Sequence, residues 1–162
     1  MAKLRVVLDC NAFLRAFISP KSLSEQILKH AERKDILLFI SRDIVSELEE
    51  VLARPEFAES FPHFTPENWT VFLDRVRKLS KYLRIAEPVF PLERDPKDAK
   101  YIDLAVSVEA DYLITYDRDL LDLMKGIDDI SKEFRQRFRH LKVVRPDEFL
   151  KVISETELTL AP

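Results

Sequence analysis

Glycine is almost absent from this chain: Gly126 is the one glycine among 162 residues. Loops that cradle phosphate with backbone N–H groups need two or three glycines, because side chains would block the close approach. The scarcity excludes a P-loop and a dinucleotide-binding turn of the Rossmann type. We expect Gly126 to end a helix.

Cysteine and histidine are also scarce. Cys10 stands alone, so it can form neither an internal disulfide nor a cysteine-rich zinc site. The three histidines show no metal-ligand spacing. A single cysteine indicates a reduced, cytoplasmic setting. The apolar runs are about five residues long, which predicts neither a signal peptide nor a membrane span.

Four short apolar runs show no polar alternation, which is typical of strands buried on both faces of a parallel sheet. They lie at residues 4–8, 36–40, 112–114 and 143–144. The stretch 85–89 is a weaker candidate, because Pro88 would restrict it to an edge or a loop. No repeat or Pro/Gly/Ser-rich linker divides the chain.

Helical patterns lie between these runs and begin with recognisable caps. Ser41 precedes one of them, and Thr65-Pro66 opens a long helix that we expect to reach about residue 83. Asp95-Pro96 begins another helix in the same way. Because strands and helices alternate, the sequence predicts an α/β domain with three α/β/α layers and a mainly parallel central sheet.

Two acidic residues stand where strands end. Asp9 follows the first run directly, and Asp117 follows residues 112–115 by one position. Ligands of parallel sheets bind outside the carboxyl ends of the strands, so both are candidates for a site. Either could instead cap the following helix.

The acidic residues of the helix that begins near residue 96 lie on two different faces of that helix. Asp98 lies three and four residues before Tyr101 and Ile102, so it continues the inward apolar stripe. A charge there is costly unless it is paired or bound to a cation. Asp98 is therefore a functional candidate, although placement beside the helix dipole could also explain it. Asp103 points the other way, and we expect it to be a solvated surface residue.

Glu47 and Glu49 both border the apolar stripe of the helix after Ser41. Periodicity cannot choose between them, and either could be an ordinary surface carboxylate.

Positive charge gathers in residues 132–142, although the chain carries 26 Lys and Arg against 29 Asp and Glu, a net charge of -3. Phe134 and Phe138 recur at helical spacing there, which favours an amphipathic helix docked on the domain. Its other side would present Lys132, Arg135 and Arg139, which could contact the phosphates of RNA.

Four segments, in this order, resemble the PIN-domain family of metal-dependent nucleases, particularly the VapC-type toxins of toxin–antitoxin systems. They read V-V-L-D-C-N-A-F at 6–13, S-R-D-I-V-S-E-L-E-E-V-L at 41–52, R-D-P-K-D-A-K-Y-I-D-L-A at 94–105 and D-Y-L-I-T-Y-D-R-D-L-L at 111–121. The segment 143–150 is similar to the final strand and helix of the family. The resemblance covers residues 4–152, so we expect a single PIN-like nuclease domain over 1–152 and a C-terminal tail over 153–162.

The resemblance implies an acidic, metal-binding cluster with supporting polar residues around it. The catalytic and metal-binding acids would be Asp9, Glu47, Asp98 and Asp117. The supporting residues would be Asn11, which would orient Asp9 by hydrogen bonding, Thr115 and the auxiliary acid Asp119. Cys10 replaces a usual threonine, and Glu109-Ala110 replaces a turn that often contains glycine.

Converging carboxylates repel one another, which raises their pKa values unless a cation neutralises them. Oxygen ligands without Cys or His select Mg²⁺ or Mn²⁺, which can activate water for phosphodiester hydrolysis. We expect an RNA-cleaving endonuclease; the alternative is a non-catalytic RNA-binding or scaffold domain. The resemblance also implies a homodimer and a small antitoxin partner.

Overall fold

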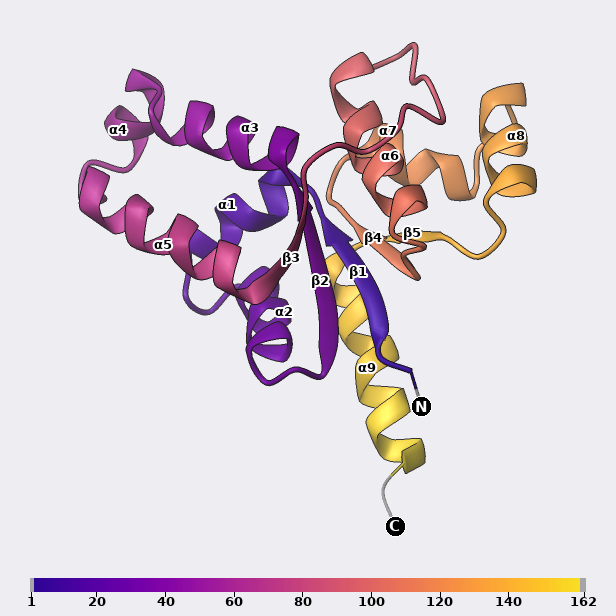
Figure 1. The fold of residues 1–162 in the computed structure, drawn as a ribbon, viewed down its shortest axis with the longest axis horizontal. Coiled ribbons are helices and arrows are strands. Elements are labelled where there is room, and N and C mark those ends of the chain that lie inside the picture. Colours follow the sequence, from indigo (N-terminus) through magenta and orange to yellow (C-terminus); the bar gives the residue numbers. More distant parts are fainter. Residues whose placement is uncertain (1, 161–162) are drawn as a thin grey trace.

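Five parallel strands form one sheet in residues 2–160, the part of the chain that the computed structural model describes (Figure 1). The strands are β1 (Leu4–Leu8), β2 (Ile36–Ser41), β3 (Ser80–Leu83), β4 (Tyr112–Ile114) and β5 (Lys142–Val144). Their order across the sheet is β3-β2-β1-β4-β5. The central position of β1 gives it two neighbours, β2 and β4.

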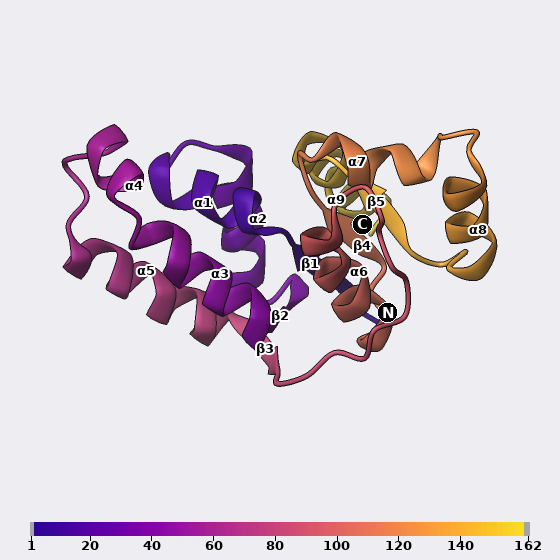
Figure 2. The ribbon, with the colours of Figure 1, turned by 90° about the horizontal axis from the view of Figure 1, so that it is seen from above.

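Helices connect the strands and cover both faces of the sheet. They are α1 (Cys10–Ile18), α2 (Leu23–Glu32), α3 (Arg42–Leu52), α4 (Pro55–Ser60), α5 (Pro66–Leu79), α6 (Ala99–Ser107), α7 (Arg118–Leu121), α8 (Asp129–Arg137) and α9 (Pro146–Leu160), with 3-10 turns η1 (Pro96–Asp98) and η2 (Asp122–Met124). Figure 2 shows β1 and β4 between α9 on one side and α6 on the other. This arrangement confirms the predicted three-layer fold.

The C-terminal helix α9 continues through residues 153–160, which the sequence had placed in a tail. None of the helices among residues 2–160 has the length and apolar character that crossing a membrane requires.

The four predicted strands form, but the fifth strand lies elsewhere than expected. Residues 85–89 form a loop, and the helix that was expected to reach about residue 83 ends at Leu79. The next residues pair with β2 in parallel, in the register Leu38↔Ser80. The free edge of β2 outweighs the local helical pattern because each residue of β3 gains a strand partner there.

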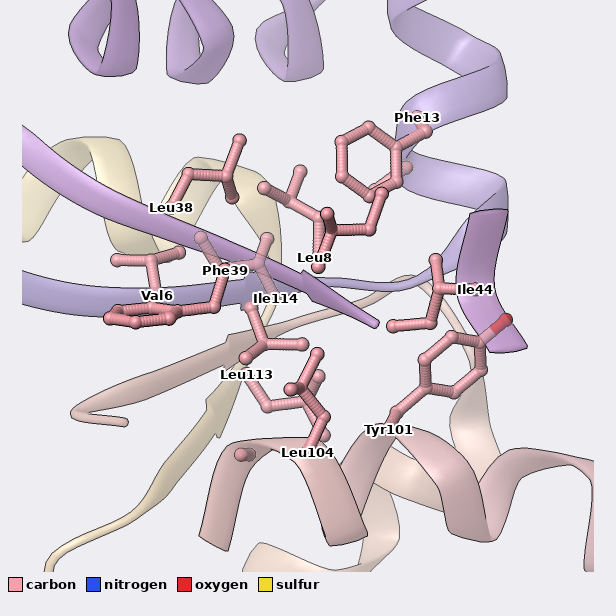
Figure 3. Packing of buried hydrophobic residues seen from close by; sticks show 14 of the residues in the cluster. Val6, Leu8, Phe13, Leu38, Phe39, Ile44, Tyr101, Leu104, Leu113 and Ile114 are labelled. Carbon is pink, nitrogen blue, oxygen red and sulfur yellow. The ribbon is translucent and has the colours of Figure 1, made fainter. Parts of the chain in front are cut away.

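The buried runs of β1 and β4 hold the centre of the domain. Val6, Val7 and Leu8 of β1 are fully buried, as are Leu113 and Ile114 of β4. Figure 3 shows several of these side chains packed with residues from the helices on either side. Complete burial of each such side chain stabilises the fold by about 2 kcal/mol. The core therefore fixes the carboxyl ends of two neighbouring strands next to each other.

Gly126 follows η2. Its φ is not positive, so a left-handed backbone conformation is not the reason for glycine at this position. An added Cβ would lie 2.8 Å from the carbonyl oxygen of Asp122, too close for any side chain. Space therefore selects glycine at this position.

Two helices end on left-handed residues that are not glycine. Glu109 after α6 has φ 52°, and Lys34 after α2 has φ 64°. After α6, the N–H of Glu109 donates to the carbonyl of Val106 at 3.1 Å and that of Ala110 to Ala105 at 2.8 Å. These two bonds make a Schellman motif, in which glycine usually takes the left-handed position.

Replacing Glu109 by Gly should raise the free energy of unfolding. Left-handed backbone costs a residue with a Cβ about 1–2 kcal/mol, while the added freedom of glycine in the unfolded chain offsets part of the gain. The expected net gain is about 0.5–1 kcal/mol, measured by urea denaturation. Ser107→Gly, two residues earlier in right-handed helix, is the matched control and should lower stability by about 0.5 kcal/mol. A loss of stability in Glu109→Gly would contradict this account.

Candidate metal centre

Parallel pairing of β1 with β4 brings two predicted acids to one edge of the sheet. Asp9 directly follows β1, and its backbone N–H donates to the carbonyl of Ile114, the last residue of β4, at 3.2 Å. Asp117 lies three residues beyond Ile114. Both acids therefore stand at the carboxyl edge, in the middle of the sheet.

Asp9 is a helix cap and a buried carboxylate at once. Its exposed fraction is 2%. Oδ1 accepts the N–H of Ala12 at 2.8 Å at the start of α1, and Oδ2 accepts the hydroxyl of the fully buried Thr115 at 2.5 Å. The Thr115 hydroxyl oxygen also accepts the N–H of Asp117 at 2.9 Å. Thr115 thus fixes both acids relative to each other.

Asp98 has a buried carboxylate oxygen, Oδ2, without a hydrogen-bond partner. Carboxylate oxygens of Asp95, Asp98 and Asp117 lie within 4.8 Å of one another. A buried polar atom without a partner is costly, and a cation shared by the three carboxylates would satisfy it. This triad is the candidate metal centre.

Sequence reasoning missed Asp95, which it treated as a helix cap. The structure gives Asp95 that role as well, since its Oδ1 accepts the N–H of Lys97 at 3.2 Å. However, residues 96–98 form a 3-10 turn rather than the first turn of an α-helix. Side chains three apart overlie one another in a 3-10 turn, which places Asp95 and Asp98 on the same side. The spacing D-P-K-D was the available signal.

Burial and mutual repulsion raise the pKa values of these acids. Burial is the main cause for Asp9, whose pKa rises from 3.8 to about 6, with smaller contributions from the charges of Asp117 and Glu47. The pKa of Asp98 rises from 3.8 to about 8 through burial first, then through the neighbouring carboxyl of Asp117 and the charge of Asp95. A site with such pKa values favours either protons or a cation.

Glu47 and Glu49, which periodicity could not separate, have different surroundings. Glu47 Oε2 accepts the hydroxyl of Tyr101 at 2.7 Å and pairs with Lys100 Nζ at 2.5 Å. In Figure 3 the ring of Tyr101 lies among the core side chains and its oxygen lies at the margin of the cluster. Glu49 instead forms a surface ion pair with Arg77 at 2.6 Å. Glu47, and not Glu49, therefore contacts Tyr101, whose hydroxyl oxygen accepts the N–H of Cys10, the residue after Asp9, at 3.2 Å.

Asn11 lies away from the role expected for it. Its side chain is exposed and makes no hydrogen bond to Asp9 within residues 2–160. The N–H of Ala12 and the hydroxyl of Thr115 orient Asp9 instead. Asp119 is half-buried, and its backbone N–H donates to Asp117 Oδ1 at 2.8 Å.

Arg135 does not present its guanidinium to solvent as expected. Its Nη1 donates to the carbonyl of Leu123 at 2.9 Å and its Nη2 to that of Gly126 at 2.8 Å. The side chain is half-buried and ties α8 to the turn before it. Lys132 and Arg139 are exposed, and the buried Phe134 confirms that α8 docks by its apolar side.

Asp103 is also not the solvated residue that the sequence predicted. It is half-buried, and its Oδ1 accepts the N–H of Val89 at 2.9 Å. This bond fixes the loop that leads to Asp95.

A second group of possible metal ligands lies near the amino end of β2. It includes a histidine, although the spacing of the histidines in the sequence is not typical of metal ligands. His30, Asp35 and Glu157 have ligand atoms within 4.8 Å of one another. Asp35 already contacts His30 Nδ1 at 2.9 Å and Arg33 Nε at 3.3 Å. This group is accounted for as a surface ion-pair cluster.

Comparisons with known proteins agree with this architecture. The family model described as PIN domain matches residues 5–119, a span that contains all five acids near the site. The uncharacterized protein MJ1680 of Methanocaldococcus jannaschii is 29% identical over 151 residues, 92% of this chain and 91% of that protein. The crystal structure of PAE2754 from Pyrobaculum aerophilum superimposes with a TM-score of 0.56 at 17% identity. That match covers 94% of this chain and 90% of the other and shows a shared fold.

Without divalent ions, the free energy of unfolding should fall as the pH rises from 5 to 8. The folded protein keeps a proton on Asp98 up to about pH 8, whereas the unfolded chain releases it near pH 3.8. The folded state therefore binds more protons across this range, and raising the pH disfavours it. Urea midpoints measured in a chelator at both pH values check this.

Asp98→Asn should remove most of this pH-dependent fall in the free energy of unfolding. Asp43→Asn, a substitution of an exposed aspartate, should retain it. An equal fall in wild type and Asp98→Asn would show that Asp98 is not the responsible group.

Proposed function

This chain belongs to the PIN-domain family, and on that premise we propose that it is a divalent-metal-dependent endoribonuclease that hydrolyses phosphodiester bonds. The observation that carries the proposal is the convergence of Asp95, Asp98 and Asp117 around the unpartnered Oδ2 of Asp98. Four acids were expected at this edge, and Asp95 adds a fifth.

The donor set favours a hard cation. Only carboxylate oxygens converge in the triad, and oxygen ligands without sulfur or imidazole suit Mg²⁺ or Mn²⁺. Asp95, Asp98 and Asp117 would hold the ion, with Asp9 beside them. When bound, such an ion activates water and stabilises the charge of a phosphodiester under attack.

The neighbouring residues keep these acids in position. Asp9 cannot swing away because each of its oxygens accepts a hydrogen bond, from Ala12 N–H and from Thr115. Glu47 could hold a second ion or orient the attacking water. Its charge is already paired with Lys100, which favours the orienting role.

The resemblance to VapC-type toxins supports a more specific proposal. We assign the chain to the toxins of type II toxin–antitoxin pairs, acting in the cytoplasm as a homodimer. A small antitoxin would inhibit it by covering the acidic edge with its tail. Four motifs in register support this assignment.

The purified full chain should cleave single-stranded RNA in the presence of Mg²⁺ or Mn²⁺. EDTA, which removes these ions, should stop the cleavage. Asp98→Asn should reduce the rate by at least about 100-fold, the upper range for residues that only support metal ligands. Glu47→Gln should also reduce it, whereas Glu49→Gln on the same helix should not. Gel analysis of a labelled RNA measures each rate.

Cleavage that persists in EDTA and in Asp98→Asn would come from another site or a contaminant. If no RNA is cleaved and calorimetry detects no binding of Mn²⁺, the enzyme proposal fails. RNA binding without cleavage would then favour the non-catalytic alternative.

Induced expression of the wild-type chain in a bacterial host should arrest growth. Asp98→Asn, expressed to the same level, should not, because the arrest requires RNA cleavage. Growth curves and immunoblots measure both. Normal growth with an active wild-type enzyme would indicate a housekeeping nuclease and contradict the toxin assignment.

A further inference from the structure

Two arginines hold their guanidinium groups against one aromatic ring beside the acidic cluster. Tyr116 lies between Thr115 and Asp117 in the chain. The guanidinium carbon of Arg15, on α1, is 4.0 Å from the centre of the Tyr116 ring. That of Arg145, which follows β5 directly, is 5.7 Å from it. Neither contact is needed for the proposed metal centre.

The topology places these three residues at the same edge as the acids. Arg15 comes from the helix after β1, Tyr116 from the segment after β4, and Arg145 from the segment after β5. These strands are consecutive neighbours in the sheet. The two arginines therefore lie beside Tyr116 at the same ends of the strands as the acids.

The guanidinium groups retain free hydrogen-bond donors. Arg15 is exposed, and within residues 2–160 no carboxylate oxygen lies within 4.0 Å of its nitrogens. Arg145 uses Nε for a surface pair with Asp147 at 3.2 Å, and its two Nη atoms make no hydrogen bond in that range. Stacking on an aromatic ring orders a guanidinium without consuming its N–H groups. Both side chains are thus ordered and available.

We propose that Arg15 and Arg145, ordered by Tyr116, bind a backbone phosphate of the RNA strand next to the phosphate at the acidic cluster. The identity of the ligand rests on the proposed nuclease function. Guanidinium groups match phosphate oxygens with paired N–H donors. An acidic chain needs such local positive charge to hold RNA, and the carbonyl-bound Arg135 does not supply it.

The site also defines a path for the strand. With one phosphate at the acids and the next at the arginines, the strand runs along the carboxyl edge from β1 across β4 toward β5. Tyr116 is a positioning residue in this scheme. Its ring orders the two arginines, because the ring face contacts their guanidinium groups.

Fluorescence anisotropy of a short labelled single-stranded RNA tests the site. The full chain carrying Asp98→Asn provides the background, so that binding is measured without cleavage. Adding Arg15→Gln or Arg145→Gln should weaken binding about 5-fold and lower the salt slope of log Kd by about 0.7 each, the change expected for one lost phosphate contact. Arg33→Gln, the same charge change at an exposed arginine near the amino end of β2, should leave the slope unchanged.

Two substitutions of Tyr116 test whether its ring orders the arginines, because neither substitution changes the charge of the protein. Tyr116→Phe keeps the ring and should bind RNA as the background does, whereas Tyr116→Leu should weaken binding as much as losing one arginine. Circular dichroism verifies that each variant is folded.

Unchanged slopes in both arginine variants, or a background that binds no RNA, would overturn the proposal. If Arg139→Gln lowers the slope while Arg15→Gln and Arg145→Gln do not, the RNA contact lies at the end of α8 and the proposal fails as well. If binding depends on Arg15 while the wild type cleaves no RNA, the phosphate site stands and the nuclease proposal fails.

Discussion

Repulsion among carboxylates at one edge of the sheet is the constraint around which the rest of the structure is arranged. Burial strengthens this repulsion and raises the pKa values of Asp9 and Asp98. The acids nevertheless stay converged because the fold holds them: the Thr115 hydroxyl and the N–H of Ala12 bind Asp9, and the N–H of Asp119 binds Asp117. Convergence is thus prepared by the protein, and a cation would find its ligands already in place.

Positive charge is distributed around this acidic centre by side chains. Lys100 pairs with Glu47 on the helix after β2, and Arg15 lies against Tyr116, which follows β4. A protein with one glycine cannot surround phosphate with backbone N–H groups. Side-chain cations and a carboxylate-bound metal would be the remaining means; Arg15 and the candidate metal ligands both lie at the carboxyl ends of the strands.

The sequence predicted what depends on local burial and missed what depends on distant partners. Runs buried on both faces identified β1 and β4, and the acids that follow them, because burial leaves a simple apolar signature. β3 carries no such signature, since it exists by pairing with β2. Helical periodicity did not separate Glu47 from Glu49; the family resemblance chose Glu47, and the contact with Tyr101 distinguishes the two in the structure. The carbonyls that bind Arg135 belong to a turn outside its own helix. The 3-10 turn that brings Asp95 beside Asp98 was hidden by its α-helical appearance.

The hydrogen bond between Asp9 and Thr115 joins residues that are 106 positions apart. During synthesis the first acid therefore leaves the ribosome long before the strand that will order it. Until β4 is made, one edge of β1 has no partner, and a parallel pairing over such a separation is slow to form. Assembly of the acidic cluster is consequently a late event in the synthesis of the chain, and a product terminated before β4 lacks the cluster altogether.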